Sequence, residues 1–333
     1  METSLLLPAI EDELKTAVQH AGGAGLDELR HMIAYHMGWE GQGAGPSAQG
    51  KRIRPMLVLL AATAAGGEWK AALPAAAAVE LLHNFSLIHD DIDDNSPLRR
   101  GRPTVWRKWG VPQAINTGDA MFALSHLALT RLSETASPGI ALQAARLFHQ
   151  TCLHLTQGQY LDMVYQSRSN LRVDDYWPMI GGKTAALLSA CTGLGALVAG
   201  ADESELHAYR EFGRLLGLAF QVQDDLLGIW GDAFLTGKSI ESDLVEGKKS
   251  LPVLYGLEKG GAFAERWQRG PVSPEEAPAL AGLLEEAGAR TFTEQTAARL
   301  TRQAMQSLAD ANPQKEGGAA LRDLAQMLVN RLK

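Results

Sequence analysis

The chain has 333 residues, of which 46% are hydrophobic and 21% are charged, and its formal net charge is −7. This is the balance of an ordinary globular protein with enough apolar residues for a sizeable core. The acidic charge balance excludes the broad basic surface by which nucleic-acid-binding proteins are recognised, so we expect no nucleic-acid partner.

Long helices are predicted along most of the chain. Residues 71–89 and 211–230 are rich in Ala and Leu and poor in β-branched residues, and strand alternation is hard to find anywhere. We interpret the segments that interrupt this pattern as loops rather than domain linkers. The prediction is an all-α protein in which residues 1–333 form a single domain of many helices. The interrupting segments are residues 38–51, 133–140, 258–276 and 309–318.

The cysteines and the apolar runs bear on the compartment of the protein. Cys152 and Cys191 lie among apolar and small residues, which is typical of buried free thiols in a reducing compartment, so we expect a cytoplasmic protein. The N-terminus has no signal-peptide pattern. Gly, Asp or His breaks the longest apolar runs before about 18 residues, so we expect no stable membrane insertion.

Four aspartates follow the first predicted helix, and arginines come directly after them. If the helix continues to residue 94, Asp90 and Asp94 stack one turn apart and Asp91 lies beside them. Like charges this close repel by about 4 kcal/mol at an effective dielectric of about 20, and the C-terminal end of a helix disfavours anions. A divalent cation reverses this cost, and ligation by carboxylates alone indicates a hard ion such as Mg²⁺. A solvated acidic helix end is the alternative.

A second aspartate pair, Asp224 and Asp225, lies inside another apolar run. Phe220, Val222 and Leu226 surround it along the helix, so it is difficult to keep both carboxylates exposed. Two such pairs in two apolar helices suggest helices that face one polar cavity, as in the metal sites of helix bundles.

Basic residues gather near both pairs, and this combination favours a diphosphate ligand. Metal ions neutralise one side of a diphosphate, while the forks of Arg and the point charges of Lys bind the other side. The glycine-rich phosphate loop of nucleotide kinases does not occur. Taken singly, each basic residue is also compatible with a solvated surface charge. The residues are Lys51, Arg52, Arg54, Arg99, Arg100, Lys183, Lys238, Lys248 and Lys249.

Together these motifs resemble those of the trans-polyprenyl diphosphate synthases, which join isoprenyl units head to tail. Six motifs occur in the family's order, from GKRIRP at residue 50 to GKKSLP at residue 247. The first aspartate-rich motif of the family, DDxxD followed by RRG, matches Asp90, Asp91 and Asp94 with residues 99–101. The second, which follows a glutamine, matches Gln221, Asp224 and Asp225. The resemblance implies a helix bundle around a deep central cavity, and a homodimer.

The resemblance also implies a role for each site residue. Asp90 and Asp94, with Asp91 in support, hold two Mg²⁺ ions, and Asp224, next to Asp225, holds a third. All three ions bind the diphosphate of the allylic substrate. The same diphosphate is bound by Arg99, Lys183 and Lys238. Isopentenyl diphosphate is bound by Lys51, Arg54, His83 and Arg100, and Lys248 contributes to substrate binding. The reacting centre is lined by Thr184 and Gln221.

One position departs from the family's pattern. The second motif of the family ends in a third aspartate, and this chain has Gly228 there. Asp232 follows four residues later, but a helix places it about 12 Å from Asp224, too far to replace the missing ligand directly. The departure puts the affinity for the third Mg²⁺ ion in question, although Asp224 itself is present.

The implied reaction is ionisation of the allylic diphosphate followed by alkylation. The double bond of isopentenyl diphosphate attacks the carbocation, and loss of a proton to the released diphosphate completes one five-carbon extension. The tail of the growing chain meets side chains before the first motif: Phe85 is bulky, Ser86 is small and Leu82 lies one turn deeper. This pattern favours geranylgeranyl diphosphate (C20). The alternatives are farnesyl diphosphate (C15) or a longer product, a terpene cyclase or irregular prenyl-coupling enzyme, and a non-catalytic partner subunit.

Overall fold

The computed structural model describes residues 3–231 and 242–329, which cluster into two compact units. The expectation that residues 1–333 form a single domain stays a prediction. One unit consists of Met1–Phe148, Cys191–Leu206 and Pro313–Gly318, and the other of His149–Ala190, His207–Asn312 and Ala319–Lys333. Most of the unit boundaries fall inside helices, namely α8 (Pro138–Ser167), α10 (Ala186–Val198), α11 (Glu203–Trp230) and α18 (Lys315–Val329), and the boundary between Asn312 and Pro313 lies between helices.

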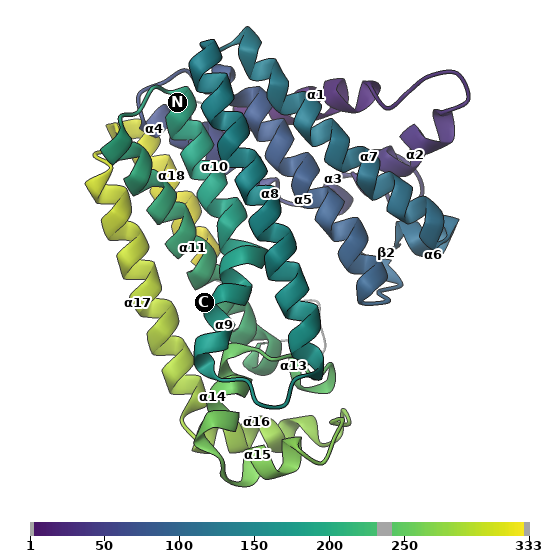
Figure 1. Ribbon diagram of the computed structural model, residues 1–333, viewed down its shortest axis with the longest axis vertical. Helices are drawn as coiled ribbons and strands as arrows, with labels where there is room; N and C mark the ends of the chain where they lie inside the picture. Colours follow the sequence, from purple (N-terminus) through teal and green to yellow (C-terminus); the bar gives the residue numbers. More distant parts are fainter. Residues whose placement is uncertain (1–2, 232–241, 330–333) are drawn as a thin grey trace. The chain divides into compact units, whose positions relative to one another are not determined.

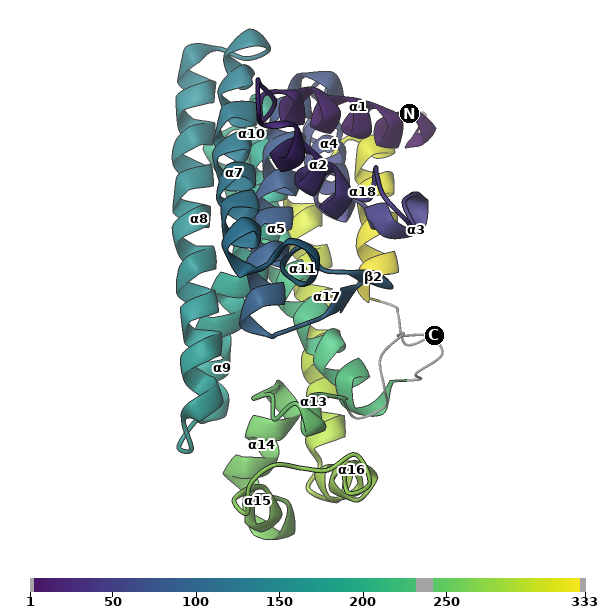
Figure 2. The same ribbon diagram turned by 90° about the vertical axis from the view of Figure 1, so that its right-hand side faces the viewer.

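The first unit is organised around α5 (Leu73–Asp93), which lies alongside α7 (Val111–Thr130) in both views (Figures 1 and 2). Four consecutive alanines of α5, residues 75–78, are buried, and their small side chains let neighbouring helices approach closely. Against α5 also pack α1 (Leu6–Gln19) and α4 (Ile53–Ala64). The unit's other helices are η1 (Thr3–Leu5), α2 (Asp27–His36), α3 (Pro46–Gln49), η2 (Trp69–Ala72), α6 (Val105–Trp109) and η3 (Arg131–Glu134).

A short antiparallel ribbon follows α5. Its strands are β1 (Leu98–Arg99) and β2 (Arg102–Pro103). The two residues between them, Arg100 and Gly101, have φ values of 52° and 74°, as a two-residue hairpin turn requires. Helices make up nearly all of the other regular structure, so the all-α prediction is confirmed with this ribbon as an exception. The ribbon is anchored by the buried Arg102, which donates hydrogen bonds to the carbonyl oxygens of Tyr35, Glu40 and Gln42.

In the second unit, short helices gather at one end of α17 (Ala289–Asp310), as Figures 1 and 2 show. One of them, α15 (Gly261–Trp267), lies in a segment that the sequence analysis interpreted as a loop, and this interpretation was wrong. Phe263 of α15 is buried in the core of the unit, so its burial stabilises a helix despite the flanking glycines. The other helices are α9 (Val173–Ile180), η4 (Gly181–Ala185), α13 (Ser242–Val245), α14 (Leu251–Lys259) and α16 (Ala277–Glu286).

Two helical stretches, Trp69–Asp93 and Val173–Val198, are long and apolar enough to cross a bilayer by length and composition alone. In the window tested, 67% of the first stretch and 72% of the second is buried within the protein. Core helices meet the same criterion, so the expectation of no stable membrane insertion stays a prediction.

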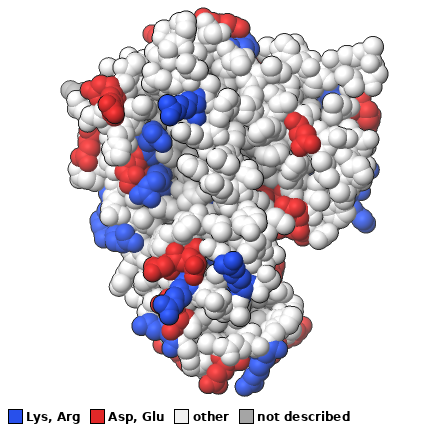
Figure 3. All heavy atoms as spheres, viewed as in Figure 1, with Lys and Arg blue, Asp and Glu red and all other residues white. Residues whose placement is uncertain are grey.

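Charged side chains of both signs share the surface. On the face drawn in Figure 3, Lys and Arg lie among Asp and Glu. This mixture agrees with the modest net charge of −7 that the sequence carries.

Candidate functional site

The first aspartate motif ends α5. The helix runs to Asp93, and the backbone N–H of Asp94 still donates to the carbonyl oxygen of Asp90 at 2.9 Å. Asp90 and Asp94 are therefore one helical turn apart on the same face, as the sequence predicted.

Asp91, between them, is buried and bound to Arg99 of the ribbon. The Nε of Arg99 lies 2.9 and 3.0 Å from the two carboxylate oxygens of Asp91, and Nη2 lies 2.8 Å from Oδ1. Burial raises the pKa of Asp91 above its usual value, and the Arg99 guanidinium opposes that shift. This ion pair links the ribbon to the end of α5 and so orients the first motif.

The turn of the ribbon brings Arg100 to the GKRIRP segment. Its Nη1 donates to the carbonyl oxygen of Ala48 at 2.8 Å. Gly50 has a φ of 80°, and a Cβ placed there would lie 2.7 Å from Nη2 of Arg100. Only glycine leaves room for this approach, which places Arg100 beside the segment that begins with Lys51.

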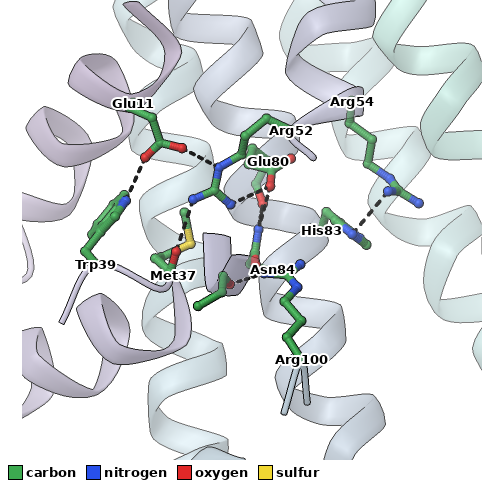
Figure 4. A network of polar contacts seen from close by, with 10 residues as sticks. Glu11, Met37, Trp39, Arg52, Arg54, Glu80, His83, Asn84 and Arg100 are labelled. Carbon is green, nitrogen blue, oxygen red and sulfur yellow. Dashed lines mark hydrogen bonds and ion pairs between the residues drawn. The ribbon is translucent and has the colours of Figure 1, made fainter. Parts of the chain in front are cut away.

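Arg52 has a structural role that the sequence analysis did not find, because it grouped this residue with the phosphate-binding cations. Its fully buried side chain lies between two acids (Figure 4): Nε donates to Glu11 at 2.6 Å and Nη1 to Glu80 at 2.9 Å. Nη2 also donates to the carbonyl oxygen of Met37 at 3.2 Å. Arg52 adopts a left-handed backbone conformation with a φ of 47°. The network therefore holds an unusual backbone at the start of α4, between Lys51 and Arg54.

His83 of α5 contacts Arg54 of α4, and Nη1 of Arg54 lies 3.1 Å from Nε2 of His83 (Figure 4). A guanidinium only donates, so Nε2 accepts and Nδ1 carries the proton of the neutral ring. Burial, followed by the charges of Arg54, Arg100 and Arg99, holds the pKa of His83 well below its usual value. We therefore expect a neutral His83 that orients Arg54 rather than adding positive charge.

His36, at the end of α2, is a second histidine held neutral near these arginines. Its Nε2 is buried and has no hydrogen-bond partner among the described residues. Burial, with the charges of Arg99, Arg100 and Arg52, lowers its pKa from 6.5 to about 3. A folded chain therefore takes up no proton here at mildly acidic pH, whereas an unfolded chain does.

Replacing His36 with glutamine is expected to reduce the loss of stability in acid. Because only the unfolded state binds this proton between pH 6.5 and about 3, the free energy of unfolding falls as the pH drops through that window. The variant's fall between about pH 7.5 and about pH 5 should be smaller by about 2 kcal/mol, measured by urea unfolding. His20→Gln, at the exposed end of α1, is the control, and an equal change in both variants would contradict the interpretation.

In the second unit, the polar residues of α11 form a chain of hydrogen bonds with neighbouring elements. The hydroxyl of Thr184 donates to Gln221 at 2.8 Å, and Nε2 of Gln221 donates to Oδ1 of Asp225 at 3.1 Å. The other carboxylate oxygen of Asp225 accepts from the Tyr176 hydroxyl at 2.7 Å and from the Leu251 N–H at 2.8 Å. Thr184 and Gln221 are thus brought together, and their place at the reacting centre stays a prediction.

The two aspartates of the second motif have different surroundings. Burial raises the pKa of Asp225 from 3.8 to about 7, and its side chain is bonded to protein groups through both oxygens. Asp224 is only partly buried. This difference favours Asp224 as the carboxylate that meets a ligand, and a metal contact by Asp225 stays a prediction.

Lys183 and Thr184 lie in η4, a π-helical turn that joins α9 to α10. The helical backbone continues through them from α9 into α10. Gly158 of α8 makes this geometry possible, because a Cβ there would overlap the backbone nitrogen of Lys183. Asp162 of α8, which the sequence analysis missed, forms an ion pair with the Lys183 ammonium.

The last predicted cations belong to the chain after α11. Lys238 and Asp232 lie outside the described residues. Lys248 pairs with Asp243 at 3.3 Å and with Glu246 at 2.6 Å. These two carboxylates raise the pKa of Lys248 above its usual value, although burial acts in the opposite direction.

The predicted chain-length residues lie in an aromatic environment. Leu82 is fully buried, and the Ser86 hydroxyl donates to the carbonyl oxygen of His83 at 2.8 Å. The Phe85 ring lies 5.0 Å from the ring of Phe122 on α7, whose ring lies 4.5 Å from that of His126. Phe85 is therefore packed against a row of aromatic rings on α7.

The donor set fits a hard divalent cation, because both motifs offer carboxylate oxygens. Among the described residues, no three His, Cys, Asp or Glu side chains converge closely enough to hold a metal ion by themselves. This agrees with Mg²⁺, which proteins often bind through one or two carboxylates together with substrate phosphates. The polar cavity predicted for the two aspartate-bearing helices stays a prediction.

The polyprenyl synthetase family model matches residues 45–273, which include both aspartate motifs. The chain belongs to the polyprenyl synthetase family. A relative named (2E,6E)-farnesyl diphosphate synthase, from Mycobacterium tuberculosis, is 40% identical over 91% of this chain and 86% of its own length. A relative named geranylgeranyl diphosphate synthase, from the same species, is 46% identical over 69% of this chain and 66% of its own length.

A solved structure is similar to this protein over nearly the whole chain. Geranylgeranyl pyrophosphate synthase from Corynebacterium glutamicum, in complex with isoprenyl diphosphate and magnesium, has a TM-score of 0.85 and 26% identity over 98% of each chain. The family identifies this protein as a Mg²⁺-dependent, short-chain trans-prenyltransferase of isoprenoid biosynthesis. The predicted enzyme class is confirmed.

Proposed function

We propose that this polyprenyl synthetase extends allylic diphosphates with isopentenyl diphosphate and ends at geranylgeranyl diphosphate (C20). The relatives divide between farnesyl and geranylgeranyl diphosphate synthases, so their names do not decide the product length. Support for a C20 product comes from Phe85, which we expect to form a wall that stops the growing chain. Its ring is backed by Phe122 at 5.0 Å and lies 4.7 Å from His89. A growing chain that reaches this wall can continue only if a packed ring moves, and such movement costs energy.

The ligands are divided between the two motifs. Asp90, Asp94 and Asp224 are the carboxylates that we expect to hold three Mg²⁺ ions, with Asp91 in support. When bound, the ions supply positive charge that stabilises the diphosphate as it leaves. The allylic diphosphate also meets Arg99 and the basic side chains Lys183 and Lys238.

The protein's own groups carry the remaining steps. Lys51, Arg54 and Arg100 bind isopentenyl diphosphate, and His83 orients Arg54. The allylic C–O bond breaks, and the leaving diphosphate takes its electron pair. The double bond of isopentenyl diphosphate then forms the new C–C bond, and the released diphosphate takes the proton. We expect the oxygens of Thr184 and Gln221 to stabilise the carbocation, and the apolar helices to exclude the water that would otherwise hydrolyse it.

We also propose a homodimer in the cytoplasm. Helix α8 exposes four large apolar side chains, and a partner subunit could cover them. They are Leu142, Leu153, Tyr160 and Met163, with exposed fractions of 73, 58, 65 and 47%. Cys152 and Cys191 are buried free thiols, as a reducing compartment permits. Analytical ultracentrifugation tests the dimer, and a monomer at micromolar concentration would contradict it. Cell fractionation tests the compartment.

Replacing Phe85 with alanine is expected to lengthen the product. Removal of the ring opens the wall next to Phe122, so a substantial part of the product should exceed C20. The products are resolved by chromatography after incubation with Mg²⁺, isopentenyl diphosphate and farnesyl diphosphate. Phe85→Tyr keeps the ring and is expected to keep the C20 product. An unchanged length in Phe85→Ala would show that the wall lies elsewhere.

A further inference from the structure

The position that departs from the family pattern is filled by another carboxylate. Gly228 lies four residues after Asp224 on α11, and therefore one turn further along the same face. A Cβ placed on Gly228 would overlap Oδ2 of Asp243 and lie 2.8 Å from its Oδ1. The Asp243 carboxylate thus occupies the space in which the side chain of a third motif aspartate would begin.

Asp243 comes from α13, and only 6% of the residue is exposed. Its side chain pairs with Lys248 at 3.3 Å, and its carbonyl oxygen accepts from the N–H of the same lysine at 2.9 Å. The ion pair with Lys248 helps to hold the carboxylate over Gly228, and the backbone hydrogen bond orders the turn after α13.

Asp243 interacts electrostatically with the second motif. Asp243 acts electrostatically on Asp225, and Asp224, Asp225 and Asp243 all act on the hydroxyl of Tyr176. Lys248 is 47% exposed at its side chain and is shared with Glu246. Burying the carboxylates of Asp225 and Asp243 near one another is costly, and a divalent cation would offset that cost.

We propose that Asp243 takes the place of the aspartate missing at position 228 and completes the oxygen donors of the second motif for the third Mg²⁺ ion. The proposal rests on the proposed three-ion function. Compared with the family's motif, one carboxylate comes from a different helix: α13 supplies the side chain, and Gly228 leaves the space for it. Reasoning from helix spacing along α11 could not find this donor, because it reaches the motif from a different helix.

Mg²⁺-dependent binding of inorganic pyrophosphate tests the proposal by a readout other than activity. Isothermal titration calorimetry at a series of Mg²⁺ concentrations gives the concentration that half-saturates binding. Asp243→Asn keeps the side-chain volume, and we expect it to raise this concentration by about 10-fold or more. Glu246→Gln, which removes the other carboxylate on Lys248, is the matched control, and we expect it to change the concentration by less than about 2-fold.

A second variant keeps the test independent of any effect of Asp243→Asn on folding. Gly228→Asp combined with Asp243→Gly exchanges the two residues, and we expect it to restore Mg²⁺ dependence to within about 3-fold of the original protein. Circular dichroism without Mg²⁺ confirms that each variant is folded. A folded Asp243→Asn protein that binds like Glu246→Gln, or a folded exchange variant that restores nothing, would overturn the proposal. Absence of Mg²⁺-dependent binding in the unchanged protein would overturn the proposed three-ion function as well.

Discussion

Asp90→Asn is expected to lower kcat/KM by about 10²- to 10³-fold. In the proposed mechanism the carboxylate charge at Asp90 would hold a metal ion against the leaving diphosphate, and an amide of the same size cannot replace that charge. Loss of one group that stabilises developing charge typically costs about 3–4 kcal/mol in the transition state. Steady-state kinetics at saturating Mg²⁺, with isopentenyl and geranyl diphosphates, measure the effect.

Asp93→Asn is the matched control, because Asp93 also lies in the last turn of α5, is exposed, and occupies a variable position of the DDxxD motif. It should keep kcat/KM within about 2-fold, since the motif requires no carboxylate at this position and exposed charges typically contribute little. Equal losses in Asp90→Asn and Asp93→Asn would indicate a general effect of the acidic helix end rather than metal binding.

Arg52→Met is expected to lower the free energy of unfolding by about 3–5 kcal/mol. It leaves Glu11 and Glu80 without their shared guanidinium, and an uncompensated buried carboxylate is strongly destabilising. Because Arg52 also holds the backbone between Lys51 and Arg54, we expect the KM for isopentenyl diphosphate to rise more than kcat falls. Urea unfolding measures the first effect, and initial rates measure the second.

Arg30→Met is the control for the charge change. Arg30 pairs with Asp27 at 4.0 Å, and both side chains are exposed, so its loss should cost less than about 1 kcal/mol. A destabilised Arg52→Met protein with an unchanged KM would limit Arg52 to folding. An unchanged stability would show that the network of Figure 4 contributes little.

The helices were predictable because their signals are local. Ala- and Leu-rich periodicity predicted the helices that carry Asp90 and Asp224, and both occur as α5 and α11. The ribbon at 98–103 was not predictable from alternation, because each of its strands has only two residues. Helix α15 was missed because the burial of Phe263, a tertiary effect, outweighs the glycines before it.

In the site, too, local spacing was predictable and contacts between distant segments were not. Spacing along one helix predicted Asp90 and Asp94 as a stacked pair, but it could not reveal that Asp91 is bound by Arg99. Asp162, Tyr176 and Asp243 were missed because each meets its site partner from a different segment of the chain. Motifs identify the residue types that a reaction needs, whereas contacts between distant segments determine which of them support the others.

Product analysis of the purified protein tests the central claim most directly. The protein is incubated with Mg²⁺, isopentenyl diphosphate and dimethylallyl, geranyl or farnesyl diphosphate in turn, and the products are separated by chain length. Condensation with at least one of these primers that ends at C20 is the predicted result. A product that ends at C15, or that extends well beyond C20, would contradict the wall assigned to Phe85. No condensation with any primer would contradict the proposed function itself.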